Sequence, residues 1–174
     1  MWVVVAVVVL VVAVATYLTW VATRVDRLHA RAEDARAALD TQSVRRAGAA
    51  IELGEQERLD DARDAGRAVL AASQGTGAAG GYLPGGPMLA RVEAENRLTR
   101  ELRLAASKFD ARVLADLAET SRRLALARQL HSDLVRDALA LRRRPLVRLL
   151  RLARRHPAPE FFDIDDPALD PPAR

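Results

Sequence analysis

The side chains able to do acid–base or metal chemistry are few and scattered. The chain has no cysteine, and its three histidines, His29, His131 and His156, stand far apart in sequence. Only His29 has carboxylates at helical spacing, Asp26 and Glu33, and such an arrangement is more typical of a surface pair than of a metal site. His131 falls on an apolar stripe, where a packed, hydrogen-bonded histidine is expected. We therefore predict no metal, no cofactor and no catalytic residue.

Other patterns that could carry chemistry have simpler explanations. Acidic residues within 52–57 and 60–64 are at helical spacing and predict solvated helix faces. A G-x-G-x-x-G pattern begins at Gly75, but no strand precedes it and Pro84 follows, so a linker is expected in place of a dinucleotide site. No serine has a histidine and a carboxylate at a recognisable spacing. The sequence thus predicts a protein that is not an enzyme and has no small-molecule substrate.

The overall charge permits a polyanionic partner without requiring one. The 174 residues carry a net charge of +4, and the sequence pI is about 10.5. Aromatic residues make up 4% of the chain, do not interleave with the basic residues and form no nucleic-acid-binding signature, so we expect no nucleic acid. Alanine, leucine and arginine are abundant, and these helix-forming residues predict an all-α protein.

The first residues predict a membrane anchor. No charged side chain occurs before Arg24, and a run of about 20 apolar residues at 1.5 Å per residue matches the roughly 30 Å hydrocarbon core of a bilayer. Trp2 near one end and Tyr17 with Trp20 near the other are placed like interfacial aromatic belts. A cleaved signal peptide is the alternative, but it would have a basic start and a shorter apolar run. We expect one transmembrane helix in 1–23.

The charges that flank this span predict its orientation. Arg24, Arg27 and Arg31 follow the span, whereas only the terminal amine precedes it. The positive-inside rule therefore places the N-terminus outside and the following domain in the cytoplasm.

Apolar residues at alternating three- and four-residue spacing predict a helical bundle over 24–156. The first long helix continues the span to about Ser73, and Gly48, Gly54 and Gly66 allow bends or a break after Arg46. The second begins near Pro87, and the third covers about 111–143. The stretch 74–87 is rich in glycine and proline and predicts a loop. We expect an antiparallel up-and-down bundle of three long helices and a short C-terminal helix. The three apolar stripes are Val25, Leu28, Ala32, Ala35 and Leu39; Met88, Val92, Glu95, Leu98, Leu102, Ala105 and Phe109; and Val113, Leu117, Thr120, Leu124, Ala127, His131, Leu134, Ala138 and Leu141.

The short segment that starts at Pro145 has two interpretations. Its leucines and Val147 fall on one side of a helix, and the other side carries Arg148, Arg151, Arg154 and Arg155. The segment is either an ordinary bundle helix with solvated arginines or an interfacial helix on anionic lipid, where each basic residue near the surface adds about 1 kcal/mol. In the acidic, proline-rich tail 157–174, we expect Phe161 and Phe162 to pack on the bundle and the rest to be disordered.

A polar octet, L-D-T-Q-S-V-R-R, interrupts the first stripe from Leu39 to Arg46. With the span before it, this octet resembles the first long helix of the LemA family, which carries a motif like I-D-V-Q-L-K-R-R shortly after a membrane anchor. The stretch A-R-Q-L-H-S-D-L-V-R-D at 127–137 is similar to that family's alanine-arginine-x-x-tyrosine-asparagine-x-x-valine stretch, with His131 and Ser132 at the tyrosine and asparagine positions. P-E-F-F-D-I-D-D at 159–166 is similar to the family's aromatic-acidic close.

The three motifs occur in the family's order and cover nearly the whole chain. A-G-A-A-I at 47–51 replaces the family's proline-containing stretch, which indicates a diverged member. The resemblance implies an antiparallel helical bundle anchored in a bacterial cell membrane, with no established enzymatic activity and, for some members, a link to membrane organisation.

On physical grounds the octet predicts a buried polar layer shared with facing helices. The residues expected to take part are Asp40, Gln42, Arg45, Arg46, Glu95 and His131. Such a layer fixes helix register at some cost in stability. Replacing Asp40 and Arg46 together with leucine is expected to leave a folded protein with altered register or association.

Two functions are compatible with these features. The first is a membrane-anchored structural or scaffolding protein that acts through protein contacts of its bundle, with an unknown partner or with itself. The alternative is a module that binds anionic lipid surfaces through the basic segment 145–155.

Overall fold

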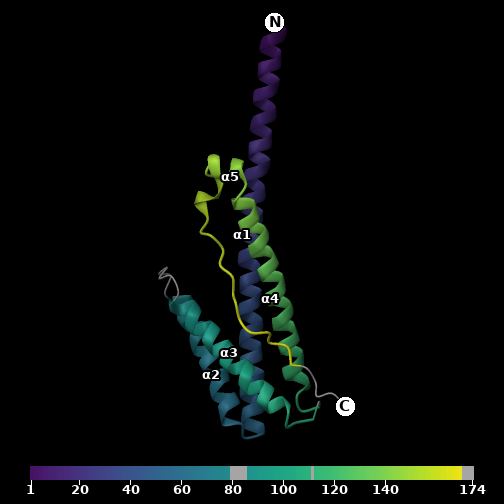
Figure 1. Ribbon diagram of the computed structural model, residues 1–174, viewed down its shortest axis with the longest axis vertical. Helices are drawn as coiled ribbons and strands as arrows, with labels where there is room; N and C mark the ends of the chain where they lie inside the picture. The colour runs from purple at the N-terminus through teal and green to yellow at the C-terminus, as the bar shows by residue number, and fades with distance from the viewer. Residues whose placement is uncertain (79–85, 111, 170–174) are drawn as a thin grey trace. The chain divides into compact units, whose positions relative to one another are not determined.

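The computed structural model describes residues 1–78, 86–110 and 112–169, and every regular element in these ranges is helical (Figure 1). The all-α prediction is confirmed. The elements are α1 (Trp2–Gln56), α2 (Asp60–Ala78), α3 (Gly86–Ala106), α4 (Ala115–Arg142), α5 (Pro145–Leu149) and the 3-10 helix η1 (Leu152–Arg155). Of the predicted loop 74–87, residues 79–85 lie outside the described ranges, while α2 and α3 extend into its two ends.

The chain divides into two compact units. The first unit consists of Met1–Asp34 and Ser132–Phe161, and the second consists of Ala35–His131 and the residues from Phe162 onward. Each unit has buried clusters of its own.

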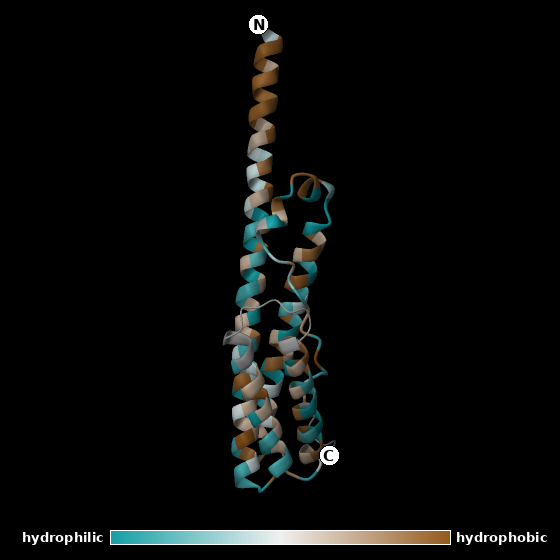
Figure 2. Cartoon of the chain, turned by 90° about the vertical axis from the view of Figure 1, so that its left-hand side faces the viewer, coloured by the Kyte–Doolittle hydropathy of each residue, from teal (hydrophilic) through white to brown (hydrophobic). Residues whose placement is uncertain are grey.

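The N-terminal part of α1 is long and apolar enough to cross a bilayer, a property that membrane spans share with signal sequences. Its most apolar window of 18 residues contains no buried residue. In Figure 2 the turns nearest the N-terminus are coloured mostly hydrophobic, and paler turns follow them. Uncovered apolar surface of this extent is typical of segments that contact a membrane or another protein.

The first unit has a small core next to this apolar stretch. Val21 and Val25 of α1 pack with Leu141, Val147 and Ala153. The prediction of one helix over 145–155 is wrong, because α5 ends at Leu149 and Arg151 takes a left-handed backbone with φ of 53° before η1 begins. In a continuous helix two residues six positions apart would point about 120° away from each other. The break lets Val147 and Ala153 enter the same core.

In the second unit, the prediction of one helix from α1 to Ser73 is wrong. α1 ends at Gln56, and Arg58 adopts a left-handed conformation with φ of 57°. The N–H of Leu59 donates to the carbonyl of Gly54 at 2.9 Å, which is the closing hydrogen bond of a Schellman cap. Such a cap usually has glycine where Arg58 stands, so this helix end carries no recognisable stop signal.

The predicted acidic face at 60–64 is in part a helix start. Asp60 and Asp61 lie in the first turn of α2, where the positive end of the helix dipole favours carboxylates. The returning helix passes very close to α1. A Cβ atom at Gly54 would lie 2.7 Å from the Cβ of Arg63, and one at Gly66 would lie 2.9 Å from the carbonyl oxygen of Ala47. Glycine at these two positions therefore permits the close packing of α1 and α2.

Residues of the second and third predicted stripes enter the core of the second unit, together with residues of α1 and α2 outside those stripes. The largest cluster takes its members from all four long helices and includes Ala47, Leu53, Ala65, Val69, Leu98, Leu102 and Leu117. Val113 was predicted to be in the third stripe, but it is exposed and Leu114 is buried in its place. The reason is that α4 begins only at Ala115, so Val113 lies in a turn where helical periodicity does not apply.

The C-terminal segment 162–169 has no regular secondary structure and lies against the second unit. Phe162 and Ile164 join a second buried cluster with Leu39 and Leu124, and Leu169 joins the main one. Phe161, in the first unit, is exposed, so only one of the two phenylalanines packs as predicted.

Candidate functional site

The polar octet of α1 contributes to a buried ion pair in the second unit. Arg46 and Glu95 are both 0% exposed, and Nη1 of Arg46 donates to Oε2 of Glu95 at 3.2 Å. The hydroxyl of Ser43 donates to the other carboxylate oxygen, Oε1. Both oxygens of the buried carboxylate are thereby hydrogen-bonded, as burial of a charged group requires.

The rest of the Arg46 guanidinium is also hydrogen-bonded. Its Nε donates to the hydroxyl of Ser121 at 3.1 Å, and Nη1 and Nη2 both donate to the hydroxyl of Thr99 at 3.1 Å. Nη2 also donates to the carbonyl of Pro167 at 3.4 Å. Through one side chain, α1 is connected to α3, to α4 and to the C-terminal segment. We call Ser43, Arg46, Glu95, Thr99 and Ser121 the Arg46 layer.

Burial dominates the electrostatics of this pair. It lowers the pKa of Arg46 from its ordinary value, opposed by the charge of Glu95. It also raises the pKa of Glu95, opposed by the hydrogen bond from Ser43 and by the charge of Arg46. The two shifts have the same cause, since water is excluded from both charges. A pair of this kind costs desolvation energy and is more effective at specifying which helices meet than at stabilising them.

A second ion pair occupies the same unit. Nη1 of Arg91, which is 2% exposed, donates to Oδ1 of Asp40 at 2.7 Å. The guanidinium carbon lies 5.2 Å from the centroid of the Phe162 ring, in a cation–π arrangement. Nε and Nη2 of Arg91 have no hydrogen-bond partner among the described residues. Asp40 and Arg46 thus have different partners on α3.

The predicted layer is therefore assembled in part. Arg46 and Glu95 meet directly, and Asp40 is half-buried in its own pair. Gln42 is half-buried, and within the described ranges its Oε1 accepts no hydrogen bond. Arg45 is exposed and takes no part, because it lies on the solvent side of α1.

His131 is buried in the second unit but does not join the Arg46 layer. It is 3% exposed, and its Nδ1 finds no hydrogen-bond partner in the described part of the chain. Burial lowers the pKa of His131, and the charge of Arg36 adds to this while Asp40 opposes it. The prediction of a packed histidine is correct, whereas its Nδ1 lacks the predicted hydrogen bond within the described residues.

Four residues of the two networks were missed in the sequence: Ser43, Arg91, Thr99 and Ser121. Three of them are small hydroxyl residues, which occur as often on exposed faces as in buried networks. Each lies three or four positions from a predicted stripe residue, so a wider stripe would have included them. Arg91 could not be distinguished from a solvated arginine without the tertiary structure.

Side chains of the second unit hold the backbone of the C-terminal segment. Arg128 donates to the carbonyl of Ile164 at 2.9 Å, and Arg103 donates to that of Asp166 at 2.8 Å. The N–H of Asp165 donates to the side-chain oxygen of Asn96 at 2.8 Å. These contacts, with that of Arg46 to Pro167, attach the segment through its main chain.

In the first unit the predicted surface pair of His29 is wrong, since His29 is buried at 4% exposure. Its Nδ1 lies 2.9 Å from the carbonyl of Val25, and its Nε2 lies 3.0 Å from Nη1 of Arg142. Because a guanidinium can only donate, Nε2 must accept and Nδ1 must carry the proton. The His29 ring stacks on the ring of His156, with the two centroids 4.7 Å apart, and Nε2 of His156 lies 2.9 Å from Oδ1 of Asp26. This arrangement accounts for both histidines without a ligand.

The basic segment of the first unit is open to solvent. Arg148, Arg151 and Arg154 are exposed, and the side chain of Arg155 lies outside the described part. Its leucines are exposed as well: Leu146 at 42%, Leu149 at 77% and Leu150 at 40%. Of the predicted apolar side, Val147 is the fully buried residue, because α5 is only five residues long.

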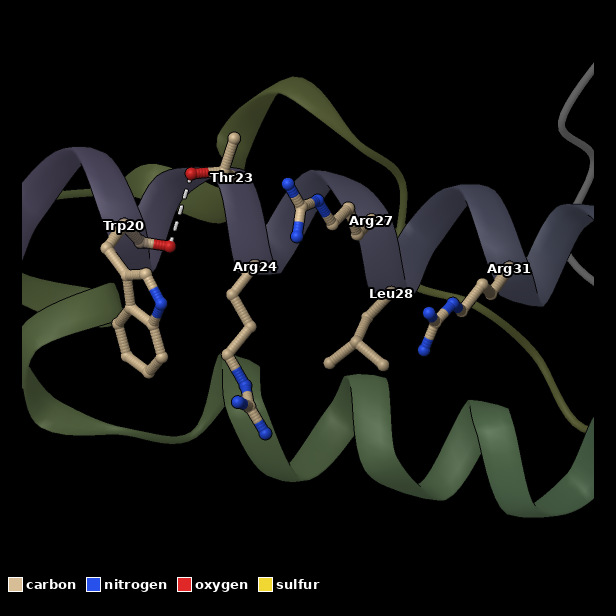
Figure 3. Close-up of a pocket in the computed structure, with 6 residues that line it drawn as sticks. All are labelled: Trp20, Thr23, Arg24, Arg27, Leu28 and Arg31. Carbon is tan, nitrogen blue, oxygen red and sulfur yellow. Dashed lines mark hydrogen bonds between the residues drawn. The ribbon is translucent and has the colours of Figure 1, made fainter.

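A pocket of about 240 Å³ lies in the first unit, just beyond the apolar stretch of α1 (Figure 3). It is lined by Trp20, Thr23, Arg24, Arg27, Leu28 and Arg31. Another, of about 370 Å³, lies in the second unit between the end of α1 and the start of α4, where Glu52, Glu57, Arg112 and Asp116 contribute charge. Neither lining contains a histidine, and in the described ranges no three histidine or acidic side chains are grouped to hold a metal ion.

Comparisons with family models, with curated proteins and with solved structures gave no match to this chain. The resemblance to the LemA family therefore depends on its motifs. Two octet residues form ion pairs with α3, Arg46 in a fully buried pair and Asp40 in a half-buried one, and the acidic close supplies Phe162 and Ile164 to the core.

Proposed function

We propose that this protein is a membrane-anchored, non-enzymatic scaffold of the LemA type. The observation that supports this most strongly is the combination of an uncovered apolar helix with a bundle whose best-organised polar cluster, the Arg46 layer, is closed to solvent. A catalytic cluster must be accessible to a substrate, whereas a structural one need not be. The bundle is antiparallel in this proposal, since the short connections from α1 to α2 and from α3 to α4 favour antiparallel neighbours.

Two features of α1 favour a retained anchor over a cleaved signal. The helix continues without a break from the apolar stretch to Val21 and Val25, which belong to the core of the first unit. The hydroxyls of Thr16 and Thr19 donate at 2.9 Å to carbonyls four residues earlier, so the polar groups of the stretch are satisfied within the helix, as lipid requires. The arginines after the span favour a cytoplasmic bundle at a bacterial cell membrane, with the N-terminus outside.

Protein contacts need an exposed apolar surface on the bundle. Leu126 and Leu130, one turn apart on α4, are 68% and 55% exposed, and they are the surface that we assign to self-association or to an unidentified protein partner. Leu104 on α3 is 61% exposed and has no exposed leucine one turn away, so it provides a matched control.

The test has two parts. Alkaline washing of membranes that contain the full chain should leave it in the pellet, and release into the supernatant would refute the anchor. Chemical cross-linking in the membrane, followed by mass spectrometry, should yield adducts that Leu126→Glu with Leu130→Glu removes and Leu104→Glu preserves. Equal adducts in all three proteins would refute the assigned surface.

A second candidate, binding of anionic lipid surfaces by the segment 145–155, is favoured by one observation. Val147 packs beside Val21, at the end of the apolar stretch, while Leu149 is 77% exposed next to Arg148. An exposed leucine at that position would enter the headgroup layer. Because the chain has no cysteine, Leu149→Cys can carry an environment-sensitive dye, with Leu126→Cys as the control. A blue shift at Leu149→Cys in anionic vesicles, and not in neutral ones, is expected; no difference would exclude this candidate.

A further inference from the structure

Three exposed arginines of α1 follow the apolar stretch on one helix face. Arg24, Arg27 and Arg31 line the pocket of about 240 Å³ together with Trp20 and Leu28 (Figure 3). None of the three forms an ion pair with a described carboxylate, although Asp26 lies between them in sequence, and Asp26 is instead paired with His156. Several exposed arginines of α2 and α4, such as Arg67, Arg122 and Arg136, do have acidic partners.

The pocket also has an ordered aromatic wall. The guanidinium carbon of Arg24 lies 5.6 Å from the centroid of the Trp20 ring. Such a cation–π contact orients the guanidinium while leaving its N–H groups free to donate. In Figure 3 the side chains of Arg27 and Arg31 extend back along α1 in the direction of Trp20. Arg24 is thus the arginine beside the tryptophan, and Arg27 and Arg31 follow it along the helix.

The distance along the helix determines which arginines reach a lipid phosphate. If the hydrocarbon core ends near Val21, the rise of 1.5 Å per residue puts Arg24 about 4.5 Å beyond it, Arg27 about 9 Å and Arg31 about 15 Å. A headgroup layer is about 5–7 Å thick on each side of a bilayer. Because helical side chains lean toward the N-terminus, Arg24 and Arg27 lie within reach of phosphates, and Arg31 lies beyond.

We propose that Arg24 and Arg27, with Trp20 beside them, form a binding site for the phosphate of an anionic phospholipid headgroup. The guanidinium fork matches phosphate oxygens, and tryptophan is suited to the interface between chains and headgroups. The ligand is a lipid and not a soluble phosphate, because the site begins within one helical turn of the apolar stretch. This inference rests on the proposed membrane anchor, and it assigns a lipid class to a site separate from the segment 145–155.

The experiment uses the quenching of Trp20 in the full chain. The chain has two tryptophans, so Trp2→Phe leaves Trp20 as the single fluorophore. The protein is reconstituted in phosphatidylcholine vesicles that contain equal mole fractions of brominated phosphatidylglycerol or brominated phosphatidylcholine. We expect the anionic lipid to be preferred about fivefold or more, since one basic residue near anionic lipid contributes about that factor.

Variants that remove arginine charges at different positions identify the site. Arg24→Gln with Arg27→Gln should abolish the preference, Arg31→Gln should retain most of it, and Arg148→Gln with Arg151→Gln should retain it in full. Absence of a preference in the parent protein overturns the proposal. So does an equal loss in the Arg148 and Arg151 variant, or a loss in Arg31→Gln as large as that in the first double variant, since both would show a long-range charge effect. Loss of the chain from alkaline-washed vesicles would instead refute the anchor, so the two failures are distinguishable.

Discussion

A double-mutant cycle on Arg46 and Glu95 gives the most direct test of the Arg46 layer. Arg46→Met leaves Glu95 buried with one hydroxyl donor, and Glu95→Leu leaves Arg46 buried without a counter-charge. Removing one partner of a buried ion pair costs about 3–5 kcal/mol, because an uncompensated charge remains. Each single variant should therefore lose a large part of the 5–15 kcal/mol that is typical of folded domains.

The double variant, Arg46→Met with Glu95→Leu, should be far more stable than the sum of the two single-variant losses in the free energy of unfolding predicts. The double variant removes both charges. The hydroxyls of Ser43, Thr99 and Ser121 lose their partners, which costs about 1 kcal/mol each. The cost is smaller where a hydroxyl can donate to a carbonyl of its own helix. A total loss of about 1–3 kcal/mol is expected, against about 6–10 kcal/mol for the sum of the single losses. The coupling energy is then at least about 3 kcal/mol.

The measurement is urea unfolding of the full chain in detergent micelles, followed by circular dichroism. The exposed pair of Arg136 and Asp133 is the control, and its cycle should give a coupling of about 0.5 kcal/mol or less. Additive losses at Arg46 and Glu95, with coupling as small as in the control, would refute the view that one buried pair connects α1 to α3.

The structure also changes an expectation from the sequence. Replacing Asp40 and Arg46 together with leucine does not remove one ion pair; it deprives both Arg91 and Glu95 of their partners. Arg91 and Glu95 lie one turn apart on α3 with opposite charges, and the charge of Arg91 already acts on Glu95, so these two groups can partly compensate each other and the two losses should not simply add. We therefore expect this double variant to be less stable than the parent, in place of a folded protein with altered register, and a cooperative unfolding transition at parental stability would contradict this.

Three further predictions concern the backbone and one histidine. Arg58→Gly should raise the free energy of unfolding by about 0.5–1 kcal/mol in the urea assay, because glycine has no steric penalty at a φ of 57°; a lower stability would refute the cap. Gly66→Ala should lower stability by about 1–3 kcal/mol through its contact with α1, whereas Gly48→Ala, which has nothing within 4 Å, should raise it by about 0.5–1 kcal/mol; the same sign at both sites would contradict the close packing. The pKa of His131 is lowered by burial, so the unfolded chain takes up the proton first as pH falls below about 6.5, and stability should fall from pH 7.5 to 5.5. When unfolding is measured at both pH values, His131→Gln should lose less stability between pH 7.5 and 5.5 than the parent does. An equal loss in the two proteins would show that His131 does not cause the pH dependence.

How far the sequence predicted the structure depended on the range of the interaction. The apolar stretch, the helical class and nearly all of the buried stripe positions follow from hydrophobic periodicity, which is a local property of each helix. The stop after Gln56 was missed because Arg58 stands where the signal is normally glycine, and the break at Arg151 was missed for the same reason. Both are backbone conformations that packing imposes on residues with little preference for them.

The sequence by itself determined that this chain is helical, that its first helix is long and apolar enough for a bilayer, and that Arg46 and Glu95 face inward. Only the tertiary structure decided the partners: Arg46 with Glu95, Asp40 with Arg91, His29 with Arg142, and the C-terminal segment with three arginines. The physical reason is that periodicity assigns a side chain to a face of its own helix. The choice among several arginines and carboxylates depends on which faces meet, and that is fixed by packing between segments distant in sequence.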